Sequence, residues 1–217
     1  MLQYDYMNKN FIIFLIAVFL LFGGGFYYRY KTNAADERGA TKLMRSFEQE
    51  TEQQKVLRMI RHADNLNERD KSGRTALFYA VQHHAEPEMI GQLIKQGADT
   101  TVTDSIGQTV LMVAARYNAS ELVLGQLIAA GAPINATDRD GYTALSIAAQ
   151  FSTPGMVKKL LRAGADPDIK PADGQSIAEI LTKNEKFSDA EKEDYVLALK
   201  VLSIIGPRPR IATEKEK

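Results

Sequence analysis

The sequence contains no cysteine and only three histidines, and these absences exclude several kinds of site. Without cysteine there is no disulfide framework, no thiolate ligand for zinc and no cysteine nucleophile. Three histidines, two of them adjacent at His83 and His84, leave little material for a histidine-built metal site. An excess of charge of one sign is also lacking, since 27 Lys and Arg balance 27 Asp and Glu. Bulk charge therefore does not point to nucleic acid or another polyanion as a partner.

The common motifs of catalysis are missing as well. No G-x-x-x-x-G-K-[ST], G-x-G-x-x-G, H-E-x-x-H or G-x-S-x-G occurs, which removes the usual signals of nucleotide binding, zinc peptidases and α/β-hydrolases. We read His83 and His84 as a surface pair, because adjacent side chains on a helix point about 100° apart. We therefore expect a protein that is not an enzyme and uses no cofactor, metal or small-molecule substrate. An enzymatic function survives only as a cofactor site built across neighbouring units, which a metal-content assay would test.

One long apolar run lies near the amino end. Residues 11–28 read FIIFLIAVFLLFGGGFYY, without a charge, and as a helix they span roughly 27 Å, enough to cross a bilayer. A cleaved signal peptide is the alternative, but the candidate cut near Ala34 follows Arg29 and Lys31. The run predicts a single transmembrane helix at 11–28, with a short tail at 1–10 and a juxtamembrane linker at 29–35.

The charges that flank the apolar run indicate on which side of the membrane the carboxyl domain lies. Only Lys9 and Asp5 precede the run, whereas five cations follow it, which favours a cytoplasmic carboxyl domain (Arg29, Lys31, Arg38, Lys42 and Arg45). An alternative start at Met7 leaves the short basic head MNKN, which is typical of an export signal. A periplasmic or extracellular location of the domain therefore stays open.

The rest of the chain is repetitive. The pattern D-x-x-G-x-T-x-L begins at Asp36, Asp70, Asp104 and Asp138, a step of 34 residues, and a weaker copy, PADGQSIA, follows at 171. A second landmark, GAD or GAP, recurs in the same phase. The sequence predicts five units, followed by a flexible charged tail at 206–217 (36–69, 70–103, 104–137, 138–170 and 171–205).

Each unit predicts a turn and two helices. Asp and Gly suit a tight turn, in which Gly supplies positive φ and Asp caps its own backbone. Thr75, Thr109 and Thr143 then stand where a helix N-cap belongs. A second apolar stripe begins near Pro87 or Pro154 and ends at Gly97, Gly131 or Gly164. Helix pairs this short bury their apolar faces only by stacking, which predicts a solenoid.

These units resemble the ankyrin repeat, whose signature is T-P-L-H-x-A at a step of about 33 residues. TALFYA, TVLMVA and TALSIA carry the likeness, with GAD or GAP after each. The resemblance implies an all-α repeat solenoid of helix-turn-helix units with hairpin loops, covering 36–205. Phe78, Met112 and Ser146 replace the signature His, which puts the usual hydrogen bonding between neighbouring turns in doubt. Ser188 and Glu191 form a capping box before the final helix.

The resemblance also implies a protein-binding surface on a concave face. Carried over position by position, the family's contacts fall on turn tips and on the ends of first helices in three units, although surface residues of these types also occur without function. The expected contact residues are Arg69, Lys71, Ser72, Arg74, Gln82, His83, Thr103, Ser105, Ile106, Gln108, Arg116, Tyr117, Thr137, Arg139, Asp140, Tyr142, Gln150 and Phe151.

The sequence thus predicts a non-catalytic, membrane-tethered adaptor or scaffold that binds a protein partner, with no nucleic acid involved. The alternative is an exported ankyrin protein that protects or regulates an enzyme or engages a host protein. A mature amino terminus near residues 26–36 would favour that alternative.

Overall fold

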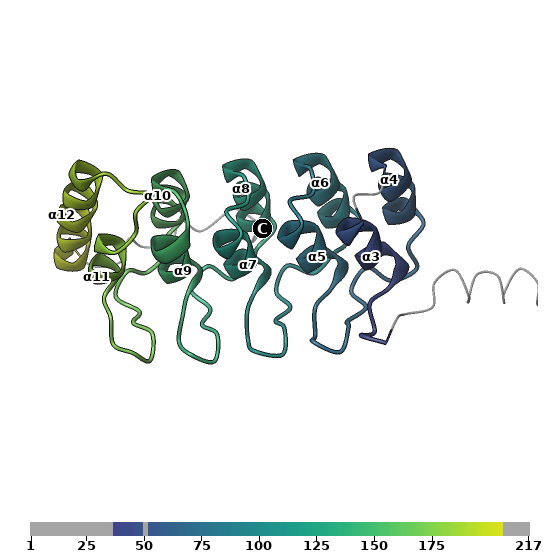
Figure 1. The fold of residues 1–217 in the computed structure, drawn as a ribbon, viewed down its shortest axis with the longest axis horizontal. Helices are drawn as coiled ribbons and strands as arrows, with labels where there is room; N and C mark the ends of the chain where they lie inside the picture. The colour runs from purple at the N-terminus through teal and green to yellow at the C-terminus, as the bar shows by residue number, and fades with distance from the viewer. Residues whose placement is uncertain (1–36, 50–51, 206–217) are drawn as a thin grey trace, which may run out of the picture.

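The computed structural model describes residues 37–49 and 52–205, and within them the chain is an array of short helix pairs (Figure 1). The first helices of the pairs form one layer and the second helices form the other. The long loops between successive pairs all project from the side of the first layer (Figure 1). The helices are α3 (Lys42–Glu48), α4 (Gln53–Arg61), α5 (Ala76–Gln82), α6 (Pro87–Lys95), α7 (Val110–Arg116), α8 (Glu121–Ala129), α9 (Ala144–Phe151), α10 (Pro154–Arg162), α11 (Ile177–Thr182) and α12 (Asp189–Ile205).

The predicted transmembrane segment at 11–28 lies outside the described residues. Among the residues that the structure describes, no helix is both long enough and apolar enough to cross a bilayer.

The first helices are buried on nearly all sides. In α5 every residue from Ala76 to Val81 is buried, because α5 packs against α3, α6 and α7. Thr75, Thr109 and Thr143 occupy the predicted N-cap positions with an extended backbone, and Thr41 does the same before α3. The side chains of Thr41, Thr109 and Thr143 accept a cap hydrogen bond, whereas that of Thr75 does not. A helix of seven residues is marginal in water, so this stacking supplies most of its stability.

The second helices bury one stripe each. In α6 this stripe consists of Met89, Ile90 and Leu93, and the opposite face is open to solvent. Proline occupies the first turn of α6 and α10, as predicted. The glycines after these helices have φ of 90°, 87° and 93°, a conformation that only glycine adopts without strain (Gly97, Gly131 and Gly164).

The loops between the pairs are hairpins built by aspartate. Oδ1 of Asp104 accepts hydrogen bonds from the backbone N–H groups of Ile106 (3.0 Å) and Gln108 (2.8 Å). Asp70 and Asp138 make the same pair of bonds one unit away in each direction. The prediction that the aspartate caps its own turn is therefore confirmed for these three, while Asp36 lies outside the described residues.

Neighbouring hairpins are joined through the backbone. The N–H of Ser105 donates to the carbonyl of Ser72 (2.7 Å), and the N–H of Arg139 donates to the carbonyl of Ile106 (3.1 Å). Equivalent bonds from Lys71 and Ala172 complete the series. The doubt raised by the missing signature histidine is thus removed, because main-chain groups connect the turns. The described residues hold no strand, only an isolated bridge between Thr103 and Thr109.

The residue that replaces the histidine matters inside each unit instead. Oγ of Ser146 accepts from the N–H of Thr143 at 2.8 Å, and Sδ of Met112 accepts from the N–H of Thr109 at 3.4 Å. Phe78 offers no acceptor, and the buried hydroxyl of Thr75 has no hydrogen-bond partner among the described residues. The second unit therefore lacks a cap that its neighbours have.

The expectation that the two adjacent histidines lie on one helix was wrong, and the one for the final helix was right. His83 is the C-cap of α5 and His84 follows it with φ of +53°, so the pair does not lie on one helix as expected. The capping box of Ser188 and Glu191 is confirmed, with the Ser188 hydroxyl 2.7 Å from the Glu191 carboxylate, and α12 begins directly after it at Asp189.

Candidate functional site

The predicted contact residues are all accessible to solvent. None of the eighteen is buried; Arg74, Gln82, Gln108 and Tyr142 are half-buried and the others are exposed. They come from the hairpins and from the carboxyl ends of α5, α7 and α9. We call the surface formed by these residues the hairpin face.

Exposed apolar side chains are concentrated on this face. Ile106 is 49% exposed at a hairpin tip, while Tyr117 and Phe151, at the ends of α7 and α9, are 40% and 37% exposed. The guanidinium of Arg116 lies 5.0 Å from the centre of the Phe151 ring, so a cation of one unit covers an aromatic ring of the next. Apolar surface flanked by arginine is the composition found at the centres of protein interfaces.

Arginine 69 has a structural role on this face. Its Nε donates to the Gly73 carbonyl at 3.0 Å, and its guanidinium also bonds the carbonyl of Thr103 in the next unit. Arg69 therefore ties two hairpins together while its side chain remains exposed.

Arg74 makes several contacts within its own unit. Its guanidinium pairs with the buried carboxylate of Asp70 at 3.0 Å and lies 4.8 Å from the centre of the Tyr79 ring. It also donates to the Tyr79 hydroxyl at 3.0 Å. Replacing Arg74 would leave a buried charge without its partner, so a binding loss at this position would be mixed with a loss of stability.

Tyr142 also makes contacts within the array. Its ring is half-buried and packs against the core, and its hydroxyl donates to Oδ2 of Asp173 at 3.0 Å. This hydrogen bond to the Asp173 carboxylate raises the pKa of Tyr142, because the bond needs the protonated phenol. Tyr142 therefore connects the fourth unit to the fifth, in addition to facing solvent.

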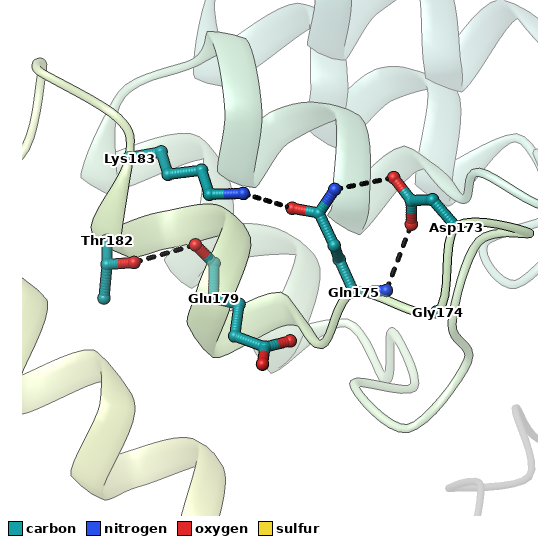
Figure 2. A pocket seen from close by; sticks show the side chains of 6 residues that line it. All are labelled: Asp173, Gly174, Gln175, Glu179, Thr182 and Lys183. Carbon is teal, nitrogen blue, oxygen red and sulfur yellow. Dashed lines mark hydrogen bonds between the residues drawn. The ribbon is translucent and has the colours of Figure 1, made fainter.

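The fifth unit contributes residues that the sequence reasoning missed. An open pocket of about 400 Å³ lies between the last hairpin and α11 (Figure 2). Figure 2 shows the Gln175 side chain between Lys183, whose Nζ donates to Oε1 at 2.7 Å, and Asp173, which accepts from Nε2 at 2.7 Å. The pocket is lined by Asp173, Gly174, Gln175, Glu179, Thr182 and Lys183.

The repeat step would have found two of these residues. Gln175 follows Tyr142 by 33 residues and Lys183 follows Gln150 by 33 residues, so each occupies the fifth-unit equivalent of a predicted contact. The prediction stopped at the fourth unit, and the hairpin face continues one unit further.

The charge of the hairpin face changes along the array. Arg69 and Lys71 make the second hairpin basic, whereas Asp140 and Asp173 make the last two hairpins more acidic. Within residues 37–49 and 52–205, no group of three or more His, Asp or Glu side chains is placed to hold a metal ion.

A comparison with protein-family models finds a match for the middle of the array. Residues 83–171 match the family described as ankyrin repeats (3 copies), a stretch that runs from the end of α5 to the start of the last hairpin. No curated protein resembles the chain closely enough to count as a match. Ankyrin repeats serve as protein interaction modules, and this chain carries them over residues 83–171.

Proposed function

We propose that this chain is a non-catalytic adaptor, tethered to a membrane by residues 11–28, that binds a protein partner on its hairpin face. The observation that carries the binding surface is the group formed by Ile106, Tyr117 and Phe151, three of the five large apolar side chains that are exposed in the described residues. Aromatic side chains beside arginine contribute the largest share of the energy at many protein interfaces.

The scaffold supports recognition because it holds this face in one shape. Backbone hydrogen bonds join each hairpin to the next, and the first helices behind them are buried. A surface that is ordered before binding loses little conformational entropy on association, which leaves more of the contact energy for affinity. A standard interface buries about 800 Å² on each partner, an area that three or four stacked units supply.

The tether rests on the sequence of the apolar run and its flanks. The seven residues of the linker at 29–35 span at most about 25 Å when extended, so the repeats stay near the bilayer surface. A tether of this length raises the effective concentration of the module toward partners in the same membrane.

The binding experiment compares two exposed apolar sites. Ile106→Ala combined with Tyr117→Ala removes the centre of the proposed surface, whereas Leu122→Ala removes a side chain that is 60% exposed on α8, away from the hairpins. Proximity labelling in the native membrane identifies the partner of the unaltered chain, and titration then measures its affinity for each variant. We expect a loss of about 2 kcal/mol or more, roughly thirtyfold in Kd, for the double variant and little change for Leu122→Ala.

Equal capture by the double variant, or loss with Leu122→Ala alone, would place the interface elsewhere. The tether is tested separately by washing membranes with high salt and at alkaline pH, because a protein with a spanning segment stays in the membrane. Recovery of the full-length chain in the wash would contradict the tether and leave the binding surface unaffected.

A second candidate is an exported ankyrin protein that acts on the outer side of the membrane, favoured by the short basic head around Lys9 before the apolar run. Protease added to sealed cells distinguishes the two. Digestion of the repeats would support export, and protection would support a cytoplasmic adaptor.

A further inference from the structure

We propose that the outer face of α4 binds the anionic lipid headgroups of the membrane that holds the chain. This proposal rests on the membrane tether proposed above. It assigns the first helix pair a second role, which is to set how the array lies on the bilayer.

The outer face of α4 is a basic stripe. Val56, Leu57 and Ile60 are buried against the rest of the array, which fixes the side of the helix that faces inward. At about 100° per residue, the positions opposite this side are 55, 58 and 62. The side chains there are Lys55, Arg58 and His62, all exposed, with the exposed Arg61 beside them.

No acidic side chain on α4 neutralises this stripe. The helix reads QQKVLRMIR, and neither Lys55, Arg58 nor Arg61 forms an ion pair with an acidic side chain in the described part of the chain. The nearest carboxylates in sequence belong to Glu52 before the helix and Asp64 after it. Nε of Arg61 donates to the carbonyl of Leu57 at 3.3 Å, a bond that leaves its charge without an acidic partner. Exposed cations without an acidic partner are available to an anionic surface.

The other second helices do not combine this charge with this location. The outer helices α6 and α8 each carry a glutamate in the first turn, and α12 begins with Asp189 and Glu191. Helix α10 is basic, but it belongs to the fourth pair and its Lys159 donates to the carbonyl of Glu121 on α8. α10 therefore serves as the matched control.

Chain length places α4 near the lipid. The helix pair of α3 and α4 is the end of the described array that follows the linker at 29–35, and that linker reaches no more than about 25 Å. Arg29 and Lys31 beside the apolar run carry the same sign of charge as the stripe. Because salt screens exposed charges beyond about 10 Å at 0.1 M, the stripe must lie close to the headgroups to be attracted.

The absence of cysteine makes the test direct. Gln54→Cys introduces a single thiol at an exposed position of α4, to which a fluorescent donor is attached. The full-length labelled chain is reconstituted into vesicles that contain an acceptor-labelled lipid. One set of vesicles is phosphatidylcholine alone, and the other also contains phosphatidylglycerol.

We expect more energy transfer to the lipid in the anionic vesicles, and loss of that excess at high salt. Lys55→Glu with Arg58→Glu should abolish the excess, whereas Lys158→Glu with Arg162→Glu on α10 changes net charge equally and should retain it. All four residues are exposed, so thermal unfolding should be unchanged in both variants.

Two results would overturn the proposal. Equal transfer in both kinds of vesicle would show that α4 does not contact anionic lipid, and equal loss in both charge-reversed variants would show that only net charge matters. Flotation of the vesicles after an alkaline wash tests the tether separately, because only a chain inserted in the bilayer floats with them. A chain that floats but shows no excess transfer refutes the docking alone, and a chain that fails to float refutes the tether and, with it, the docking.

Discussion

The hydroxyl of Tyr79 donates a 2.8 Å hydrogen bond to Oδ2 of Asp70, and both side chains are buried. The same oxygen pairs with the guanidinium of Arg74, which also lies over the Tyr79 ring. Asp70 thus joins the second hairpin to α5, in addition to capping its own turn through Oδ1. The third and fourth units lack this link, because Val113 and Ile147 occupy the position of Tyr79 there.

Tyr79→Phe should therefore destabilise the fold. The variant keeps the ring and its packing but removes one of the bonds that stabilise a buried carboxylate, at a cost of about 1 to 3 kcal/mol. Urea denaturation measures the change in free energy of unfolding. Tyr117→Phe is the control, since that ring is exposed and its hydroxyl makes no hydrogen bond in the described structure, and it should change the free energy by less than about 0.5 kcal/mol.

The Asp70 carboxylate should also make stability depend on pH. Burial would raise the pKa of Asp70, but the Arg74 N–H, the Tyr79 hydroxyl and the Arg74 charge outweigh it and hold the pKa below its ordinary value. A carboxyl whose pKa is lower in the folded state stabilises the fold fully above its unfolded pKa, about 3.9 for aspartate. That contribution is lost as pH falls through the folded pKa.

Asp70→Asn isolates this effect from the other carboxyl groups. We expect the difference in unfolding free energy between the unaltered chain and the variant to be constant from about pH 5 to pH 8 and to shrink below about pH 4. A difference that stays constant into strong acid would show that Asp70 does not titrate with a lowered pKa.

Tyr79 should make stability depend on pH at the alkaline end. Burial, and then the hydrogen bond to Asp70, raise the pKa of Tyr79 to about 12. A phenol whose pKa is raised in the folded state stabilises the fold below its unfolded pKa, about 10, and this contribution is lost as pH rises toward 12. The advantage of the unaltered chain over Tyr79→Phe should therefore fade between about pH 10 and pH 12.

Much of this fold could be predicted from the sequence because its landmarks act locally. The 34-residue step, the Asp and Gly of each turn, the Thr caps and the Pro starts each constrain only their own few residues, and the structure has them where they were expected. Contacts between units depend on which side chains meet across a step of the array. The bond from Tyr142 to Asp173 and the ring contact between Arg116 and Phe151 could not be read from a local pattern.

The site was predicted less completely for the same reason. Position-by-position transfer located exposed residues, but it could not separate Ile106, whose side chain is free, from Arg74, which is committed to Asp70. It also stopped before Gln175 and Lys183, although the repeat step extends to both.

The close approach of neighbouring hairpins can be tested with two glycines. Both Gly107 (φ +84°) and Gly97 (φ +90°) would be strained by a side chain, which costs on the order of 1 to 3 kcal/mol. A Cβ at Gly107 would also lie 3.3 Å from backbone atoms of Asp138 and Arg139 in the next hairpin, whereas a Cβ at Gly97 meets nothing within 4 Å.

Gly107→Ala should therefore lower the thermal midpoint further than Gly97→Ala does. Equal midpoints would show that the hairpins yield to the added methyl group and do not determine the spacing of the array. A larger effect at Gly97 would contradict the prediction, because a Cβ there meets no neighbouring atom.

The second unit lacks a helix cap that its neighbours have. Replacing threonine by valine at two equivalent positions, Thr75 and Thr143, should therefore change the free energy of unfolding differently. Oγ1 of Thr143 accepts from the N–H of Ser146 at 3.2 Å, so Thr143→Val removes a helix cap and should cost about 1 kcal/mol. The hydroxyl of Thr75 is buried with no hydrogen-bond partner among the described residues. Phe78 also offers no acceptor to the N–H of Thr75, whereas Met112 and Ser146 accept from the equivalent N–H groups. Valine keeps the branched shape of threonine, so Thr75→Val removes an unsatisfied polar group and should leave the free energy of unfolding unchanged or raise it. Urea denaturation of both variants measures the contrast, and equal losses at Thr75 and Thr143 would show that the Thr75 hydroxyl has found a partner after all.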